Sequence, residues 1–233
     1  MKKNIATVGG PSDIAIATVN QISNEEYNFF ALIREQDKSS ELSNLGVGVT
    51  IGDATSEEDI KNFVTSVKES GEIHGVLHSV GSFAVRPPHA MNKEAFESVI
   101  STNLTSAFLT LSIAGKAMLS QGHGRMVFMS SVAGSLGLVN HEAISAAKGG
   151  IESMVRSAAA TYANRGLRIN AVAPGLTDTK LASPIMSNET ASQAASQKIP
   201  IKRVNEKEEI AEVLKWLLTE SPDNFTGQIM HTD

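Results

Sequence analysis

A glycine-rich turn near the start of the chain is the first feature that could do chemistry. Residues 9–15, GGPSDIA, follow a short apolar run and precede a stretch with helical spacing. The free backbone N–H groups and the dipole at a helix N-terminus form a ready site for a phosphate group. The turn therefore indicates a phosphate-bearing ligand, although many turns that bind nothing also contain paired glycines.

The titratable side chains limit which kinds of catalytic or metal site the chain can form. The chain has six histidines and no cysteine, which excludes a disulfide framework, a thiolate metal site and a cysteine nucleophile. His141 could transfer a proton near neutral pH, or it could be an exposed histidine in a first helical turn. His78, at the end of an apolar run, either touches a ligand or fills a turn. The other four histidines lack metal-ligand spacing, so no metal is expected.

Short apolar runs alternate with longer segments of helical periodicity. Most of the runs are nearly uninterrupted by polar residues, which is typical of strands buried on both faces of a parallel sheet. Apolar residues recur with three/four spacing, which indicates amphipathic helices, at 96–118, 207–219 and, more weakly, 59–67. The alternation predicts an α/β fold with a doubly wound parallel sheet. The expected strands are 4–8, 28–33, 47–51, 75–80, 125–130, 168–173 and 228–231.

We expect residues 1–233 to form a single domain, because no repeat, low-complexity tract or linker divides the chain. Ligands of doubly wound sheets bind beyond the carboxyl ends of the strands. Side chains that follow the strands should therefore share one cleft. The least regular segment is 181–205, rich in Ala, Ser, Gln and Asn. It is either a mobile substrate lid or a surface helix with loops.

Charge and hydropathy exclude several partners. The formal net charge of −5 argues against a nucleic-acid-binding surface, which is normally basic. The apolar run that follows the N-terminal MKKN is too short for a signal peptide, because residues 11–13 interrupt it. No stretch approaches the roughly 18 apolar residues of a membrane span. We therefore expect a cytoplasmic protein with neither a membrane nor a nucleic acid as partner.

Polar residues at the ends of the expected strands carry a family resemblance. HSVG (78–81) ends the fourth strand, Asn103 lies in the next helix, Ser131 ends the fifth strand and Lys148 lies in the helix after it. RINAVAPG (168–175) and LTDT (176–179) complete the sixth strand and its turn. In order and spacing these residues resemble the short-chain dehydrogenase/reductase family over essentially the whole chain, and RINAVAPG is the most specific part.

The resemblance implies a Rossmann-type fold, a nicotinamide cofactor and a homodimer or homotetramer formed through two long central helices. It also implies a proton-relay site. Ser131 would hydrogen-bond the substrate carbonyl, Lys148 would bind the nicotinamide ribose and Asn103 would hold a water. Each residue has a structural alternative: a serine that closes a tight turn, a solvated helix lysine, and an amide that bonds to helix backbone.

The tyrosine that the family carries four residues before the lysine is absent. Ile144 occupies that position, and the chain's two tyrosines lie elsewhere. A local role could explain it: with Asn140 as a helix N-cap, Val139 and Ile144 would form a hydrophobic staple. A positioned acid contributes about 10²–10⁴-fold to a rate. An efficient enzyme would therefore need another proton source, either His141 or water.

The resemblance also predicts how a cofactor is held. Gly9 fits the family's first glycine, but Asp13 replaces the second, and its carboxylate would repel a pyrophosphate unless Ser12 caps the helix. Arg34, which follows the second strand, favours the 2′-phosphate of NADP, while Glu35 beside it leaves NAD possible. The residues expected at the cofactor are Gly9, Ser12, Ile14, Arg34, Asp53, Ala54, Ser79, Gly81, Lys148, Pro174, Gly175, Thr177 and Thr179.

Two functions from different classes follow. The first is an NADP-linked oxidoreductase that transfers a hydride between the nicotinamide and a small carbonyl or alcohol. It would be weak or atypical, with Ser131, Lys148, Asn103 and His141 as catalytic residues. The second is a non-catalytic, cofactor-sensing or scaffold member of the same fold. The first is favoured because most of the cofactor positions remain.

Overall fold

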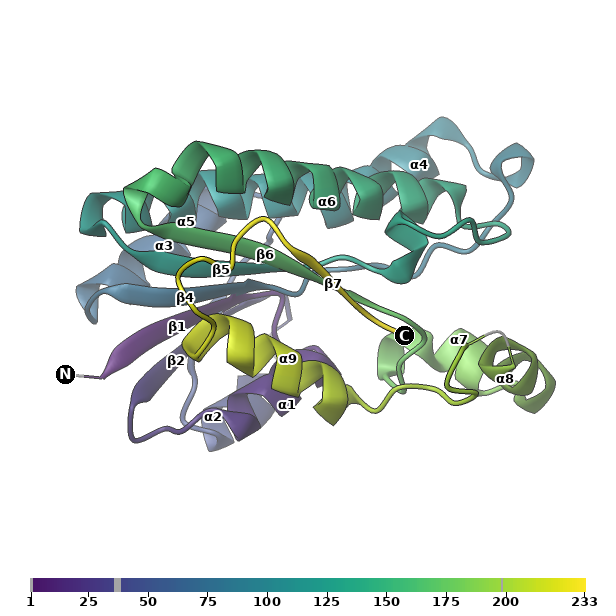
Figure 1. Ribbon diagram of the computed structural model, residues 1–233, viewed down its shortest axis with the longest axis horizontal. Coiled ribbons are helices and arrows are strands. Elements are labelled where there is room, and N and C mark those ends of the chain that lie inside the picture. Colours follow the sequence, from purple (N-terminus) through teal and green to yellow (C-terminus); the bar gives the residue numbers. More distant parts are fainter. Residues whose placement is uncertain (1, 36–38, 198) are drawn as a thin grey trace.

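The computed structural model describes residues 2–35, 39–197 and 199–233, which form a parallel sheet between two layers of helices (Figure 1). The order of the strands is β3-β2-β1-β4-β5-β6-β7, so the chain winds outward in both directions from β1. The predicted doubly wound fold and all seven expected strands are confirmed. The strands are β1 (Lys3–Val8), β2 (Tyr27–Ile33), β3 (Gly48–Ile51), β4 (Ile73–His78), β5 (Gly124–Met129), β6 (Leu167–Pro174) and β7 (Ile229–Thr232).

Each face of the sheet has its own hydrophobic core, because successive side chains of a strand point to opposite faces. Met126 and Phe128 of β5 pack toward one layer, whereas Val127 and Met129 pack toward the other. The first layer contains α3 (Glu57–Glu69), α5 (Ser106–Gln121) and α6 (Glu142–Tyr162) (Figure 1). The second contains α1 (Asp13–Gln21), α2 (Ser39–Asn44) and α9 (Lys207–Thr219).

The helix expected at 96–118 is interrupted by a wider turn. It divides into α4 (Lys93–Ile100) and α5, with a π-helical turn at Ser101–Thr105 between them. Such turns are rare and frequently occur at functional sites. This one contains Asn103, which the sequence had placed in a regular helix, and it turns that side chain toward the end of β4.

The same helical run bears on the expectation about membranes. Within Lys93–Gln121 an 18-residue window reaches a mean hydropathy of 1.2, so by length and composition alone this run could span a membrane. The run is not continuously apolar, because Asn103 and several serines and threonines interrupt it, so the expectation about apolar stretches is not overturned. The apolar residues that the run buries, among them Ala107, Leu111 and Met118, pack in the core against the sheet. A core helix shows this pattern.

Segment 181–205 is mainly helical. It contains α7 (Ser183–Met186) and α8 (Glu189–Ser196), which extend beyond the carboxyl end of the sheet, close to the C-terminus (Figure 1). Its backbone matches the second of the two predicted alternatives, a surface helix with loops. Its position also suits a lid, since several of its side chains line the cleft described below. Its mobility stays a prediction.

The start of α6 differs from the expected cap. The N-cap is His141, one residue later than predicted, and Asn140 takes a left-handed conformation with φ of 64°. Asparagine tolerates that conformation better than most residues. Val139 is 79% exposed while Ile144 is buried in another cluster. The predicted hydrophobic staple is therefore wrong.

Candidate active site

A cleft of about 1250 Å³ opens at the carboxyl ends of the strands. Its walls come from the turns after β1, β2, β3, β4, β5 and β6, from α6 and from segment 181–205. The structure brings together in this cleft every residue that the sequence placed at a cofactor or in a relay. They are Gly9, Ser12, Ile14, Arg34, Asp53, Ala54, Ser79, Gly81, Asn103, Ser131, His141, Lys148, Pro174, Gly175, Thr177 and Thr179.

The backbone conformation of the glycine turn explains why residue 9 is a glycine. Gly9 has φ of +95°, and a Cβ there would lie 2.6 Å from the side chain and backbone nitrogen of Val80. Only glycine fits such a position. Ser12 caps α1, because its Oγ accepts the N–H of Ala15 at 3.1 Å. The turn therefore presents the N-terminus of α1 to the cleft.

Asp13 is held away from the cap by a contact that the sequence did not reveal. Its Oδ2 accepts the backbone N–H of Lys180 at 2.6 Å, and its Oδ1 lies 3.7 Å from the Lys180 Nζ. This contact ties the glycine turn to the segment after β6. It also places a positive charge beside the carboxylate, which reduces the repulsion that Asp13 would exert on a phosphate.

Two charged residues stand at the ends of β2 and β3. Arg34 is largely exposed at the rim of the cleft, and its guanidinium lies 3.6 Å from the Glu35 carboxylate. The Asp53 carboxylate accepts the N–H and the hydroxyl of Thr55 at 2.7 and 2.8 Å. These two hydrogen bonds lower the pKa of Asp53. Asp53 therefore closes a turn and lines the cleft at the same time.

Lys148 and Asn103 are both buried beside Gly81. The Nζ of Lys148 donates to the carbonyl oxygen of Met129 at 2.8 Å, so the alternative of a solvated lysine is wrong. Burial lowers the pKa of Lys148 to about 8. The Nδ2 of Asn103 donates to the carbonyl oxygen of Val99 at 2.9 Å. Asn103 thus makes the helix-backbone bond of its structural alternative while it also lines the cleft.

Ser131 lies at the end of β5, facing Pro174 of β6. Its Oγ accepts the N–H of Ala133 at 3.2 Å and lies 3.5 Å from the carbonyl oxygen of Pro174. Ile144, one turn along α6 from Lys148, is buried with Ala133 in a small apolar cluster. The position where the resemblance places a phenol is therefore filled by a hydrocarbon side chain.

His141 is the titratable group beside this hydrocarbon. Its Nδ1 lies 2.7 Å from the carbonyl oxygen of Val139. Because a carbonyl oxygen only accepts, Nδ1 carries the proton, and in neutral His141 the lone pair is on Nε2. In the part of the chain that the structure describes, Nε2 has no hydrogen-bond partner. His141 also belongs to the lining of the cleft.

The side chain of His78 is buried in the protein interior and does not line the cleft. Its Nε2 lies 2.9 Å from the Oγ of Ser106, which in turn donates to the carbonyl oxygen of Thr102 at 2.6 Å. Desolvation lowers the pKa of His78 to about 3, so the ring is neutral at physiological pH. Of its two alternatives, the structural one is correct.

Glu152 is a buried carboxylate that the sequence analysis missed. It accepts the hydroxyl groups of Ser130 and Ser135, each at 2.9 Å, and the Nε2 of His231 lies 3.0 Å from the Oγ of Ser135. The network fastens the turn that carries Ser131 to α6 and β7. A signal for it exists, because Glu152 follows Lys148 by four residues and so lies on the same helix face.

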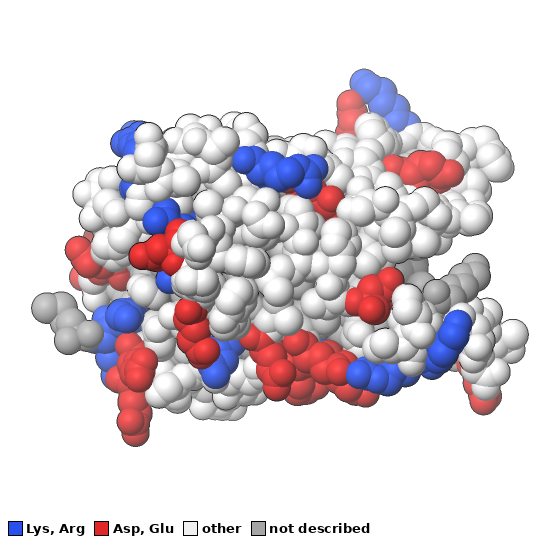
Figure 2. Space-filling view, in the orientation of Figure 1, with Lys and Arg blue, Asp and Glu red and all other residues white. Residues whose placement is uncertain are grey.

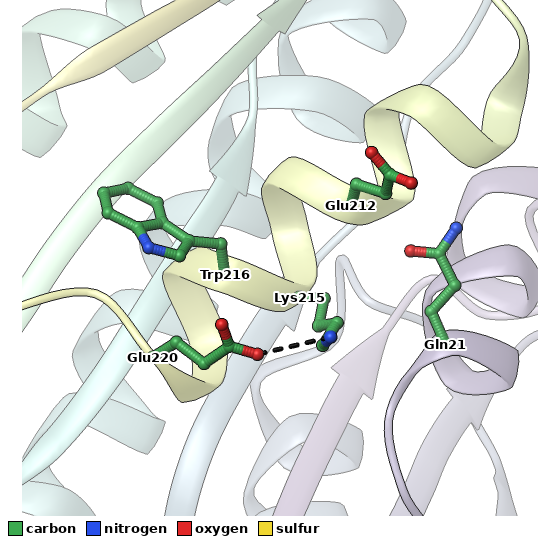
Figure 3. A pocket seen from close by; sticks show the side chains of 5 residues that line it. All are labelled: Gln21, Glu212, Lys215, Trp216 and Glu220. Carbon is green, nitrogen blue, oxygen red and sulfur yellow. Dashed lines mark ion pairs between the residues drawn. The ribbon is translucent and has the colours of Figure 1, made fainter.

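A second pocket, of about 420 Å³, lies between α1 and α9 and contains none of the predicted residues. Figure 3 shows its side chains spread around α9 without converging on one point. Lys215 and Glu220 form an ion pair at 3.3 Å. Over residues 2–35, 39–197 and 199–233 there is no group of three or more His, Cys, Asp or Glu residues that could hold a metal ion.

The fold and this cleft define an α/β protein with a doubly wound parallel sheet, and comparison with known proteins gives its family. A family model described as enoyl-(acyl carrier protein) reductase matches residues 9–233. The chain belongs to this family, among the short-chain dehydrogenases/reductases. The family resemblance and the Rossmann-type fold predicted from the sequence are confirmed.

The relatives are similar over nearly their full length. 2-(S)-hydroxypropyl-CoM dehydrogenase 3 of Xanthobacter autotrophicus is 29% identical, covering 98% of this chain and 94% of the relative. 3-oxoacyl-[acyl-carrier-protein] reductase MabA of Mycobacterium tuberculosis is 30% identical, covering 100% and 92%. The crystal structure of levodione reductase superposes with a TM-score of 0.90 at 27% identity, covering 99% and 96%. A short-chain type dehydrogenase/reductase from Mycobacterium ulcerans gives 0.94 at 24%, covering 99% and 88%.

Proposed function

We propose that the protein is an NADP-linked oxidoreductase that transfers a hydride between the nicotinamide and a small carbonyl or alcohol. The observation that carries the proposal is one cleft in which the glycine turn, Arg34, Ser131 and a buried Lys148 meet. Several relatives are named as dehydrogenases or reductases. Two proteins with the same fold, actinorhodin polyketide ketoreductase and ElxO, have structures with NADPH or NADP bound.

The residues present fit a dinucleotide. The absence of a side chain at Gly9 leaves the N-terminus of α1 open to a pyrophosphate, and Gly81 keeps the backbone close to Lys148. Arg34 would bind the 2′-phosphate, Lys148 the nicotinamide ribose and Thr179 the carboxamide. When bound, the cofactor supplies or accepts the hydride.

The reacting oxygen would lie between Ser131 and His141. Ser131 would donate a hydrogen bond to the carbonyl, and the cation of Lys148 would orient the ribose. His141 precedes Ile144 by three residues and Lys148 by seven, spacings that share one helix face. Its Nε2 would accept the proton from an alcohol when neutral, or donate one to a developing alkoxide when charged. Water is the alternative donor.

The test is steady-state oxidation of NADPH against a panel of carbonyl compounds, with His141→Ala and Lys148→Ala as variants. We expect turnover by the wild type that exceeds the Lys148→Ala rate, and a loss of about tenfold or more in His141→Ala if the imidazole supplies the proton. A wild-type rate equal to that of Lys148→Ala across the panel contradicts the oxidoreductase proposal. A His141→Ala rate equal to wild type assigns the proton to water.

A non-catalytic, cofactor-sensing or scaffold member of the family is the second candidate. Ile144, buried where the family carries its acid, favours it, and so does the carboxylate of Asp13 beside the phosphate site. Calorimetric titration with NADPH, NADP, NADH and NAD separates the two. Binding without turnover supports the second candidate, while fast turnover by the wild type contradicts it.

We further propose that residues 1–233 act as one domain of a cytoplasmic homodimer or homotetramer, with 181–205 as its substrate lid. Support for self-association comes from α5, where Phe108 is 57% exposed. Light scattering after gel filtration tests the assembly. A monomer at micromolar concentration contradicts it.

A further inference from the structure

One end of the cleft carries a patch of exposed apolar side chains. They come from three segments that are distant in the sequence: the turn after β4, the loop between β5 and α6, and the start of segment 181–205. We call this set the apolar patch, and it consists of Phe83, Val85, Leu136, Leu138, Val139 and Leu181, all of them at least 37% exposed. Exposed apolar side chains gathered in one concave site mark a place where an apolar ligand binds.

The lysine side chains at the same end already have a hydrogen-bond or ion-pair partner. Lys148 is buried and donates to Met129, and Lys180 is paired with Asp13. The carboxylate of Asp233 lies against Gly175, where it would repel an anion. Two further basic residues line the cleft in the described part of the chain: Arg34, at the opposite, β2 end, and His141, whose Nδ1 is held by the carbonyl oxygen of Val139. Among the described residues that line the cleft, an anionic substrate would therefore find no unpaired lysine or arginine beside the apolar patch.

The surface around this end agrees with that arrangement. In Figure 2 the notch on the right opens between the α4–α6 layer and the α7–α8 segment, and white, uncharged residues form its upper edge. Neutral hydroxyl groups of Ser98, Ser101 and Thr102 line the wall formed by α4 and the π-helical turn. Ile144 adds a hydrocarbon side chain next to Ser131.

We propose that the substrate is an uncharged, predominantly apolar ketone or aldehyde, or the corresponding alcohol. Its hydrocarbon part lies against the apolar patch, and its oxygen lies at Ser131. The inference rests on the proposed function, because it names the substrate class of the same site. The discriminating property is charge, since the walls at this end offer apolar contacts and neutral hydroxyl groups but no unpaired lysine or arginine to compensate a carboxylate or phosphate.

The test compares unbranched 2-alkanones of increasing length with keto acids of the same length that carry a terminal carboxylate. With NADPH, we expect kcat/KM to rise about fourfold for each added methylene until the apolar patch is covered. The keto acids should be at least tenfold poorer. A flat length dependence, or a preference for the keto acids, overturns the inference.

Binding measured without turnover separates this inference from the proposed function. Saturation-transfer NMR on the NADPH-mixed protein reports contact of each ketone directly. Length-dependent binding of 2-alkanones with no NADPH oxidation supports the apolar site and contradicts the oxidoreductase. Turnover that favours charged ketones supports the oxidoreductase and contradicts the apolar site. Absence of binding along the whole 2-alkanone series overturns the inference.

Matched variants locate the contact. Leu138→Asp places a carboxylate in the apolar patch, whereas Phe96→Asp does the same at an exposed apolar residue that lies outside both the cleft lining and segment 181–205. We expect Leu138→Asp to lower kcat/KM for 2-octanone at least tenfold and to leave the Kd for NADPH within twofold. Phe96→Asp should match the wild type in both. Equal effects of the two variants, or no effect of Leu138→Asp, contradict the placement.

Discussion

The end of the cleft proposed for the nucleotide and the corner proposed for proton transfer, which we call the nucleotide end and the acid corner, are built from different parts of the chain. At the nucleotide end the important features belong to the backbone: the positive φ of Gly9, the open N-terminus of α1 and the close approach at Gly81. At the acid corner they are single functional groups, the hydroxyl of Ser131 and the imidazole of His141. The two ends therefore respond differently to substitution.

The difference explains why Asp13 and Ile144 have unequal consequences. Asp13 replaces a glycine of the family pattern, yet Ser12 supplies the cap and Lys180 engages the carboxylate, so the backbone of the turn is retained. Ile144 replaces a phenol, and no neighbouring backbone can provide a proton. A site built from backbone tolerates a changed side chain, whereas a proton-transfer step is lost with the group that carries it.

The largest expected effect is repair of the acid corner. Ile144→Tyr places a phenol one helical turn before Lys148, and we expect it to raise kcat for carbonyl reduction by about 10²–10⁴-fold. Steady-state NADPH oxidation measures this. Ile144→Phe is the matched control, since it adds the same ring without the hydroxyl. Equal rates for the two variants would show that the missing acid does not limit turnover. Thermal unfolding of both checks for overpacking.

Lys148→Met should separate function from stability. Burying the charged amine, whose pKa is lowered from 10.5 to about 8, costs roughly 3 kcal/mol at pH 7. Loss of the hydrogen bond from Lys148 to the carbonyl oxygen of Met129 offsets about 1 kcal/mol of this gain in stability. We therefore expect the variant to be about 2 kcal/mol more stable to urea at pH 7 and to lose NADPH-dependent activity.

The pH dependence of the free energy of unfolding, compared between the wild type and Lys148→Met, tests the direction of the pKa shift of Lys148. Between pH 8 and 10.5 the unfolded chain keeps the Lys148 proton that the folded chain has released. The free energy of unfolding of the wild type should therefore rise with pH across this window relative to Lys148→Met. Parallel curves for the two proteins would contradict a lowered pKa of Lys148.

Gly9→Ala should damage the backbone-built end. The added Cβ meets Val80 at 2.6 Å and the residue must keep φ of +95°, so we expect a loss of about 1–3 kcal/mol in stability and at least tenfold weaker NADPH binding. Gly137→Ala is the control, because its Cβ would have no atom within 4 Å. Urea unfolding and calorimetry measure both. Similar losses in the two variants would mean that the conformation of the turn is unimportant.

The smallest expected effects concern the charge of Asp13. Asp13→Asn keeps an acceptor for the Lys180 N–H and removes the negative charge, so NADPH should bind about threefold to tenfold more tightly at low salt. Lys180→Met keeps the backbone donor and removes the compensating ammonium, so binding should weaken. Fluorescence titration of NADPH measures both. Changes in the same direction would contradict electrostatic control of this turn.

The sequence predicted the fold well because the relevant signals are local. Apolar runs located all seven strands, and their continuity indicated a parallel sheet before any contact was known. The polar residues after the strands were also found, since the carboxyl ends of parallel strands lie at one edge of the sheet. Their chemical roles stay predictions, with experiments given above.

Contacts between distant segments were not predictable in the same way. The partner of Asp13 is Lys180, 167 residues away, and Glu152 reaches Ser135 and the neighbourhood of His231. The exposed Val139 and the left-handed Asn140 also depended on how the loop before α6 runs over the cleft. No periodicity or motif carries that information.

By itself, the sequence determined the strands, the helices and the residues that stand where each strand ends, because hydrophobic periodicity and glycine conformation act over a few neighbouring residues. Tertiary structure alone decided which charges are paired, that Lys148 is buried and His78 is excluded from the cleft, and that six apolar side chains gather at one end of it. Burial and pairing depend on the atoms that surround a group, and most of those atoms come from elsewhere in the chain.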